Sequence, residues 1–329
     1  TGEIVDITGK GVDDIKNHII RTPNDPDTIY DDDPLRILRC IRFASRYGWE
    51  IEYDTYEGMV RNVSRLEIIT KERVKDEFCK MLTCKHPIMA MELLRKIGAM
   101  HYVIPELEET YSMTQNEYHF GTVWEHTMMV LEGTKDDNMI LRISALLHDI
   151  GKIRVCTEED GKIHFLKHEL KSGEMIDELL RPLKFSNEII KEVTFLVRNH
   201  MICKTWGSEC EYMKDKKLRR LQYECKTEER FRNLMTIIDA DNNAYAADKC
   251  MPKQVEFILS RTEAMKAEGS AMFGYKLPLT GKEIMDLKGI KPGSAVKECL
   301  DYLMKIAFAN PLRKKEEFVK HLLGYRLQK

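Results

Sequence analysis

The sequence predicts a mainly α-helical protein with one short strand at its start. Three observations favour this fold class. From Asp31 to about Arg261, apolar residues recur every three or four positions, the period of helices buried on one face. Acidic residues precede Pro34, as is typical where a helix begins. The strand-like stretch is short, covering Glu3–Ile7.

The bulk composition limits the classes of protein. At 329 residues and 38.5 kDa the chain has room for two or three domains, and its net charge of −2 means that any nucleic-acid surface must be local. The nine cysteines are odd in number and lack CxxC spacing, which indicates reduced thiols in a cytoplasmic protein. No apolar run approaches the roughly 20 residues of a membrane helix, so no membrane partner is expected.

The first thirty residues predict a strand, a turn at Thr8–Gly11, a helix from about Val12 and a connection rich in proline and aspartate. A chain that opens without Met on a strand-like segment indicates a piece of a larger or processed protein.

A basic stripe follows on the helix expected from Asp31. Its members step by three and four along one side: Arg36, Arg39, Arg42 and Arg46. A solvated face and a nucleotide-facing surface are equally compatible with charge alone. Asp33 and Arg36 lie one turn apart on the same face, and a carboxylate acceptor beside a guanidinium donor matches the pairing edges of cytosine and adenine.

The later segments continue the helical pattern. Two helices are expected on either side of Pro182, with Ser186 or Asn187 as the cap of the second. Residues 208–232 are highly charged and predict a surface loop with a helix. A soft boundary follows at 267–281, and the last 17 residues carry six Lys or Arg against two Glu, a modest basic patch.

The candidate metal ligands begin at His126 and at His148–Lys152. His148 shares a helix face with small and apolar residues, and Asp149 follows about 100° round the helix. A half-buried imidazole beside a carboxylate needs a cation or a proton, and a divalent metal satisfies both groups. Ordinary core and surface histidines are the alternative. Further nitrogen and oxygen donors follow at His168, His200, Asp239 and Asp241.

The order H…HD…H…H…D, with HDIGK at His148–Lys152, resembles the HD superfamily of metal-dependent phosphohydrolases. The resemblance implies a divalent metal on His126, His148, Asp149 and Asp241, with Asp239 as the alternative last ligand. His168 and His200 would complete a second metal site or contact phosphate. Lys152 and Asp149 are the expected catalytic residues, with Lys152 neutralising charge that develops on the phosphoester. The identity of the metal, among Mg, Mn, Ni, Co and Fe, stays open.

The segment DDDPLRILRCIRFASRYGWEIE resembles the EDxxR motif of class II tRNA nucleotidyltransferases, the CCA-adding enzymes and bacterial poly(A) polymerases, with Asp32 replacing the Glu. VDITGKGVDDIKN is similar to the flexible segment of that family, and ITKERVKDEFCKML to its ERxxxE motif. The resemblance implies nucleotide binding by Asp33, Arg36, Arg39 and Arg42, supported by Glu72, Arg73 and Glu77. It also implies CTP or ATP and the 3′ end of tRNA or another RNA as partners.

The expected organisation is a remnant of the nucleotidyltransferase head (1–30), a helical neck that recognises the nucleobase (31–111), an HD domain (112–262) and a tRNA-contacting helical tail (263–329). The transferase chemistry of the family needs a D-x-D carboxylate pair after a glycine turn, which is expected to be absent from this chain. The first expectation is therefore an RNA- and nucleotide-binding body with a phosphatase or 2′,3′-cyclic phosphodiesterase site. A non-catalytic RNA-binding module and a stand-alone HD nucleotidase are the alternatives, and the oligomeric state stays open.

Overall fold

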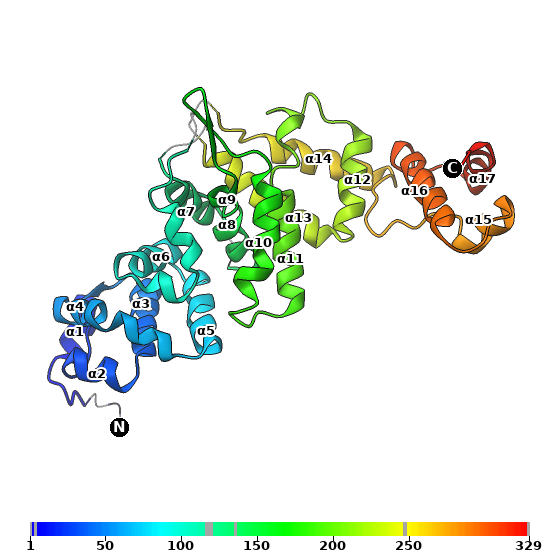
Figure 1. Ribbon diagram of the computed structural model, residues 1–329. Coiled ribbons are helices and arrows are strands. Elements are labelled where there is room, and N and C mark those ends of the chain that lie inside the picture. Colours follow the sequence, from blue (N-terminus) through cyan, green and yellow to red (C-terminus); the bar gives the residue numbers. More distant parts are fainter. Residues whose placement is uncertain (1, 3–4, 116–120, 135–136, 246–248, 328–329) are drawn as a thin grey trace. The chain divides into compact units, whose positions relative to one another are not determined.

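The computed structural model describes residues 2, 5–115, 121–134, 137–245 and 249–327 (Figure 1). It confirms a mainly α-helical protein. The chain forms two compact units. Unit 1 contains residues 1–201 and 236–250, and unit 2 contains residues 202–235 and 251–329. Within the described ranges, no helix has the length and apolar character needed to cross a membrane.

Unit 1 contains the following elements: α1 (Gly11–Asn17), β1 (Ile19–Ile20), α2 (Pro26–Asp32), α3 (Leu35–Tyr47), β2 (Glu50–Ile51), α4 (Tyr53–Asn62), η1 (Val63–Ile68), α5 (Lys71–Leu82), α6 (Pro87–Lys96), η2 (Ala99–Tyr102), η3 (Pro105–Thr110), α7 (Val123–Gly133), α8 (Met139–Leu147), α9 (Lys152–Val155), β3 (Thr157–Glu159), β4 (Lys162–His164), α10 (His168–Leu180) and α11 (Asn187–Asn199). The last residues of α13 (Glu228–Asn243) also belong to it. Unit 2 contains the start of α13 together with η4 (Lys204–Trp206), α12 (Asp215–Cys225), α14 (Gln254–Ala267), α15 (Gly281–Lys288), α16 (Ser294–Ala309) and α17 (Lys315–Gly324).

Helix α3 is the centre of the first half of unit 1, because it packs against both α5 and α6. Its apolar side, which includes Leu38 and Ile41, is fully buried, and its arginines lie on the other side. The helix ends at Gly48, whose φ of 71° places it in the left-handed conformation that glycine adopts at little cost.

The structure corrects three expectations in this half. Val5, Asp6 and Ile7 are not in a strand, while Glu3 and Ile4 lie outside the described residues. The Asp6 carboxylate instead accepts hydrogen bonds from the backbone of Thr8, Gly9 and Val12, which shapes the start of α1. The proline-rich connection contains α2, whose start is capped by the side chain of Asp25.

The third correction concerns the helix expected from Asp31, which was predicted to continue through Trp49 to Glu52. The helix ends before Gly48, and β2 pairs in parallel with β1, so that Ile20 lies opposite Ile51. A two-residue pairing between segments thirty positions apart carries no periodic signal in the sequence.

The second half of unit 1 is a bundle in which α7 and α11 both pack on α8, and α10 packs on α11 (Figure 1). Three of these helices begin with a side-chain cap. Thr122 and Glu125 form a capping box for α7, Asn138 caps α8, and Ser186 caps α11, as expected after the break at Pro182.

A β-hairpin interrupts the helical pattern that was expected to continue here. Strands β3 and β4 pair antiparallel, with Thr157 opposite His164. Asp160 and Gly161 form the turn, both with positive φ, which suits a tight two-residue hairpin. The helical pattern expected to continue to about Arg261 is therefore broken between residues 157 and 164.

Unit 2 has its own apolar core, formed by Met272 and residues of α15, α16 and α17. Within the charged segment 208–232, the structure places α12 and the start of α13. Helix α12 packs on α16, and the Arg219 guanidinium donates to the carbonyl of Ala309 at 3.0 Å. The four domains expected from the sequence remain predictions.

Candidate metal centre and nucleotide-binding region

The fold of unit 1 brings four histidines together from four helices. His126 lies on α7, His148 follows the last residue of α8, His168 begins α10 and His200 follows the last residue of α11. All four are buried, with His126 and His148 fully inaccessible. Buried imidazoles need polar partners, since an unsatisfied polar group inside a protein costs free energy.

Each ring has one nitrogen anchored to the backbone. The Nδ1 atoms lie at hydrogen-bond distance from four carbonyl oxygens: His126 with Ala244 at 3.2 Å, His148 with Ala145 at 2.8 Å, His168 with Phe165 at 2.9 Å and His200 with Val197 at 2.7 Å. A carbonyl only accepts, so each Nδ1 carries the hydrogen and each neutral ring keeps its lone pair on Nε2.

The Nε2 atoms face one another in two pairs. His126 and His148 are 3.3 Å apart at Nε2, and His168 and His200 are also 3.3 Å apart. Two lone pairs at that distance repel unless a proton or a cation lies between or beside them. The rings are therefore arranged as ligands around positive charge.

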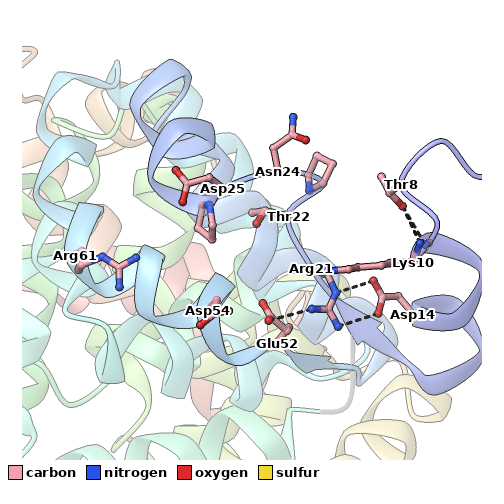
Figure 2. A pocket seen from close by; sticks show the side chains of 13 residues that line it. Thr8, Lys10, Asp14, Arg21, Thr22, Asn24, Asp25, Glu52, Asp54 and Arg61 are labelled. Atoms are coloured by element: carbon pink, nitrogen blue, oxygen red, sulfur yellow. Dashed lines mark hydrogen bonds and ion pairs between the residues drawn. The ribbon is translucent and has the colours of Figure 1, made fainter.

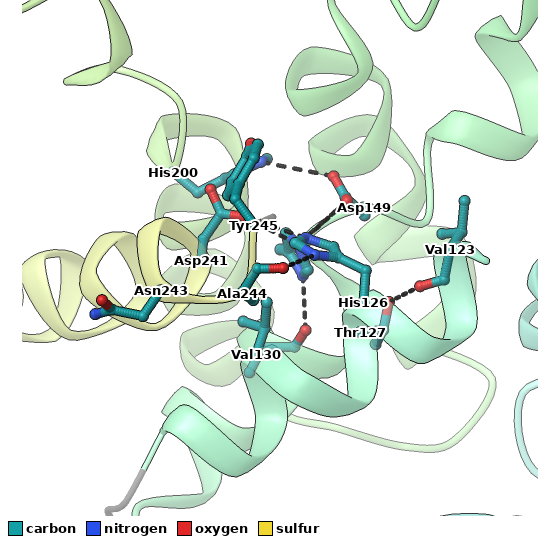
Figure 3. A network of polar contacts seen from close by, with 12 residues as sticks. Val123, His126, Thr127, Val130, Asp149, His200, Asp241, Asn243, Ala244 and Tyr245 are labelled. Atoms are coloured by element: carbon teal, nitrogen blue, oxygen red, sulfur yellow. Dashed lines mark hydrogen bonds and ion pairs between the residues drawn. The ribbon is translucent and has the colours of Figure 1, made fainter. Parts of the chain in front are cut away.

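Asp149 lies between the two histidine pairs, because its two oxygens face different rings. Oδ2 is 3.3 Å from Nε2 of His148 and 3.5 Å from Nε2 of His126, while Oδ1 is 3.1 Å from Nε2 of His168. Asp241 arrives from α13 and places Oδ1 3.2 Å from Nε2 of His126 (Figure 3). One carboxylate can thus serve both halves of the cluster.

The electrostatics of the cluster favour a neutral ring at two of these positions. Burial lowers the pKa of His126, and burial together with neighbouring histidines lowers the pKa of His200 to about 3. Burial acts against the charged form of Asp149 as well, but the positive charge of His148, Lys152 and His168 holds the pKa of that carboxyl well below its usual range. Asp149 is therefore ionised.

His148 behaves differently from the other rings. Burial opposes its charged form most strongly, yet the carboxylate of Asp149 outweighs that effect and raises the pKa of His148. Positive charge is thus favoured where the two carboxylates approach the imidazoles. A divalent cation would take over that role.

The donor set fits a divalent metal. Two groups, which share His148, have ligand atoms within 4.8 Å of one another, and each consists of three buried residues: His126, His148 and Asp241 in one, His148, Asp149 and His200 in the other. Imidazole nitrogen with carboxylate oxygen suits first-row transition metals such as Mn, Fe, Co and Ni. Mg²⁺ prefers oxygen ligands, so four imidazoles disfavour it.

Lys152 is the third charged group of the cluster and is almost completely buried. Its Nζ lies 2.6 Å from Oδ2 of Asp149 and donates to Oε1 of Gln115 at 2.6 Å. Gln115 in turn donates to the carbonyl of Thr122 just before α7. The ammonium group is therefore fixed at the carboxylate that both histidine pairs share.

Asp239 lies outside the cluster, although the sequence left it open as the last ligand. It stands two residues before Asp241 on α13, about 200° round the helix, so the two side chains leave opposite faces. Tyr245, which the sequence analysis missed, contacts the ring of His126 edge-on at 5.7 Å (Figure 3). Tyr245 lies two residues beyond the end of α13, so helical spacing in the sequence did not indicate it.

The residues expected to bind nucleotide divide between two cavities. Arg36 and Arg39 line a cavity of about 290 Å³ together with Tyr30 and Phe43. The Asp33 carboxylate pairs with Arg73 at 3.2 Å rather than with Arg36.

Arg42 belongs to a different environment, although it shares the helix with Arg36 and Arg39. Its guanidinium donates to the buried carboxylate of Glu77 at 2.5 Å, and it lines a separate cavity. Arg73 and Glu77 of the segment that resembles the ERxxxE motif therefore contact Asp33 and Arg42 of the segment that resembles the EDxxR motif. Glu72 is exposed on α5.

A third cavity, of about 820 Å³, lies where the expected flexible segment meets α2 and α4 (Figure 2). Thr8, Lys10 and Asp14 from that segment line it. Arg21 spans its floor, paired with Asp14 at 3.0 Å and with Glu52 at 3.0 Å. Its lining contains four acidic and three basic side chains, so the cavity carries no strong excess of either sign.

Comparisons with known proteins match two regions of the chain to known families. Residues 48–110 match the family described as the probable RNA and SrmB-binding site of polymerase A, and residues 116–242 match the HD domain. The chain is 26% identical to a CC-adding tRNA nucleotidyltransferase of Thermus thermophilus over 332 residues, covering 96% of this chain and 72% of the relative. It is 27% identical to an A-adding tRNA nucleotidyltransferase of Deinococcus radiodurans over 310 residues, covering 90% and 68%.

Among solved structures, the fold is similar to that of the Bacillus stearothermophilus CCA-adding enzyme in complex with CTP. The TM-score is 0.63 at 19% sequence identity, and the match covers 95% of this chain and 67% of that one. At this identity the likeness shows the fold alone. The chain is therefore homologous to the CCA-adding tRNA nucleotidyltransferases over most of its length, and it contains a region of the polymerase A RNA-binding type followed by an HD domain.

Proposed function

We propose that the HD domain of this chain is a metal-dependent phosphohydrolase acting on phosphomonoesters or 2′,3′-cyclic phosphodiesters. One observation carries the proposal: four buried imidazoles, each with Nδ1 anchored to a carbonyl, turn their Nε2 atoms toward one another and toward two carboxylates. Such an arrangement of polar groups suits the binding of a cation and does not suit packing in an apolar core.

In this proposal His126, His148, Asp149 and Asp241 hold one divalent ion. His168 and His200 hold a second, with Asp149 shared between the two. When bound, such ions polarise phosphoryl oxygens and lower the pKa of water at the site. Lys152 adds a fixed positive charge beside Asp149, placed to stabilise negative charge that develops on a phosphoryl group. Gln115 keeps that ammonium group in position.

The test uses the full chain and begins with its metal content. Purified protein should carry up to two transition-metal ions per chain by inductively coupled plasma mass spectrometry. His148→Ala should remove at least one, and His200→Ala should leave one. Hydrolysis of bis(p-nitrophenyl) phosphate and of a 2′,3′-cyclic nucleotide should fall about 100-fold or more in His148→Ala and Asp149→Asn, since ligands matter at least as much as the groups that orient them. His101→Ala, an exposed histidine paired with Glu108 at 3.2 Å, is the matched control.

Full turnover and full metal content in both His148→Ala and Asp149→Asn would refute this assignment. Two other proposals make different predictions for the wild-type protein. A non-catalytic RNA-binding module predicts steeply salt-dependent tRNA binding without turnover in Mn²⁺, Ni²⁺, Mg²⁺ or Co²⁺. A stand-alone HD nucleotidase predicts turnover without tRNA affinity at physiological salt.

We also propose that Asp33 and Arg36 select CTP and ATP, and that the 3′ end of a tRNA is the RNA partner. The cavity lined by Arg36, Arg39 and Phe43 supports this proposal, because it offers cationic and aromatic groups, and Asp33 lies three residues before Arg36 in the sequence. Asp33 would exchange Arg73 for the amino group of the base. Equilibrium binding of labelled CTP should exceed that of GTP in the wild type and lose this preference in Asp33→Ala. An unchanged preference would refute it. Nucleotide transfer itself is not assigned to this chain.

A further inference from the structure

Tyr245 is an aromatic side chain that the end of α13 brings to the candidate metal centre together with Asp241. Its ring meets the ring of His126 edge-on, with centroids 5.7 Å apart and planes at 76° (Figure 3). Sγ of Cys250 donates to the carbonyl of Tyr245 at 3.2 Å. One residue earlier, the carbonyl of Ala244 accepts from Nδ1 of His126. The side chain is therefore held beside the candidate metal ligands without being one of them.

The candidate ligands are almost sealed from solvent, whereas Tyr245 is half-buried. The side chain of His126 is 0% exposed, and that of Asp241 is 2% exposed. Another ligand with accessible surface, His168, is 10% exposed. A buried site is reached through its exposed members, so a substrate that enters the centre next to His126 is expected to contact Tyr245.

Two other polar groups beside the centre are held by one another. The ammonium group of Lys152 lies between Asp149 and Gln115, and the amide of Gln115 donates to the backbone just before α7. A tyrosine hydroxyl can donate one hydrogen bond, and with an ordinary pKa near 10 it is protonated at neutral pH. Burial, followed by the charges of Asp241 and Asp149, raises the pKa of Tyr245 further, which places the phenol near both carboxylates.

From this placement we propose that Tyr245 selects the leaving group of the hydrolysed ester, its hydroxyl donating a hydrogen bond to the ester oxygen that leaves phosphorus. In the reaction, the oxygen of water forms the new bond to phosphorus, the bond from phosphorus to the ester oxygen breaks, and one proton of water ends on that oxygen. Tyr245 keeps its own proton throughout. A donor aimed at an oxygen on which charge develops is most effective where water is excluded. This role rests on the proposed phosphohydrolase function.

The proposed contact favours one class of substrate, the esters of sugar hydroxyls. A sugar alkoxide is a poor leaving group, because its negative charge stays on one oxygen, so it needs a donor. p-Nitrophenolate spreads its charge over the ring and the nitro group and leaves without such help. Activity on sugar esters, including 2′,3′-cyclic nucleotides, should therefore depend on Tyr245, while activity on nitrophenyl esters should not.

The experiment uses the full chain with its bound metals and the variant Tyr245→Phe, which keeps the ring against His126 and removes the hydroxyl. Hydrolysis of a 2′,3′-cyclic nucleotide should fall about 100-fold, the usual effect of losing one donor to a developing charge. Hydrolysis of bis(p-nitrophenyl) phosphate should stay close to the wild-type rate. Tyr212→Phe, the same change at a tyrosine that is 68% exposed, is the matched control. Lys191→Ala, an exposed lysine on α11, is a second control, and both controls should keep both activities.

Two further measurements do not depend on turnover. Metal analysis should give the wild-type content in Tyr245→Phe, since no candidate ligand is changed. Inorganic phosphate can place one of its oxygens where the ester oxygen leaves. Isothermal titration calorimetry should therefore show an affinity for inorganic phosphate about 5-fold lower in Tyr245→Phe, the effect of one lost hydrogen bond.

An equal loss of activity on both esters, or a loss of metal, would mean that the hydroxyl only supports the fold of the centre, and would overturn the proposal. Wild-type rates on both esters, or an unchanged affinity for phosphate, would overturn it as well. A wild-type protein that binds metal and hydrolyses neither ester is a separate outcome, which would overturn the proposed function and this role of Tyr245 with it.

Discussion

Gly151 is the residue whose replacement tests most directly how the metal centre is assembled. It stands between Asp149 and the start of α9, where its backbone N–H donates to the Ser172 hydroxyl of α10 at 2.8 Å. An added Cβ would lie 2.5 Å from the carbonyl oxygen of His168 and closer still to the backbone nitrogen of Ser172. Its φ of −64° is ordinary, so the glycine is needed for the close approach and not for its conformation.

We expect Gly151→Ala to push α10 away from the turn that carries Asp149. Ordinary contact begins at 3.4 Å, so the two backbones must separate by about 1 Å. Overpacking of this kind costs about 1–3 kcal/mol. The same movement carries His168 away from Oδ1 of Asp149, now 3.1 Å distant. Urea unfolding followed by circular dichroism should show the loss of stability, and metal analysis should show loss of the ion assigned to His168 and His200.

Another glycine provides a matched control. A Cβ at Gly281 meets Val296 at an ordinary 3.6 Å, so Gly281→Ala should be neutral. If Gly151→Ala unfolds at the same urea concentration as Gly281→Ala and keeps its full metal content, the close approach does not hold the centre together and the reasoning fails.

Two further predictions concern ion pairs outside the centre. Glu77→Ala should destabilise unit 1 by about 3–5 kcal/mol, because it leaves the half-buried guanidinium of Arg42 without its carboxylate; a urea midpoint equal to that of Lys191→Ala would contradict this. The hydrogen bonds of Glu283 to Lys315 and to Thr280, which begins α15, lower the pKa of that carboxyl from 4.5 to about 2. Its contribution to stability is therefore complete above pH 4.5 and lost as the pH falls toward 2, so acid titration by circular dichroism should show less loss of helix between those values in Glu283→Gln than in the wild type.

The sequence indicated which histidines and aspartates could meet in the proposed metal centre, because their order along the chain resembles that of the HD superfamily. The choice between Asp239 and Asp241 needed the phase of α13, since residues two apart leave opposite faces of a helix. The partner of Arg42 could not be predicted at all. Glu77 lies 35 positions away, and only the packing of α3 on α5 brings the two together.

Three errors of the fold prediction have different causes. The pair Asp160–Gly161 is a strong hairpin signal, so the β3–β4 hairpin could have been predicted from the sequence. The pairing of β1 with β2 could not, because each strand has two residues and neither shows alternation. The helix α2 was hidden by its two flanking prolines, although Pro26 at the start of a helix, after an aspartate cap, is favourable.

The tautomers of two of the four histidines follow from the chemistry of helix ends. The last carbonyls of a helix have no intrahelical partner. His148 and His200 each stand directly after the last residue of a helix, and each Nδ1 is bonded to the carbonyl three residues earlier, Ala145 and Val197. His168 also bonds a carbonyl three residues earlier, that of Phe165, but this carbonyl lies in the turn before α10 and accepts the backbone N–H of His168 as well. In all three cases a local hydrogen bond turns Nε2 toward the cluster.

The Nδ1 of His126 does not bond a carbonyl of its own segment, because His126 lies inside α7, where the carbonyls already accept the hydrogen bonds of the helix. Its Nδ1 partner is the carbonyl of Ala244, 118 residues later and just beyond the end of α13. The end of α13 therefore supplies both the Asp241 carboxylate and the anchor for His126, at 3.2 Å in each case. Three of the rings are oriented by their own segments, and the fourth depends on one distant helix end. Folding of the centre is thus complete only when the end of α13 is in place.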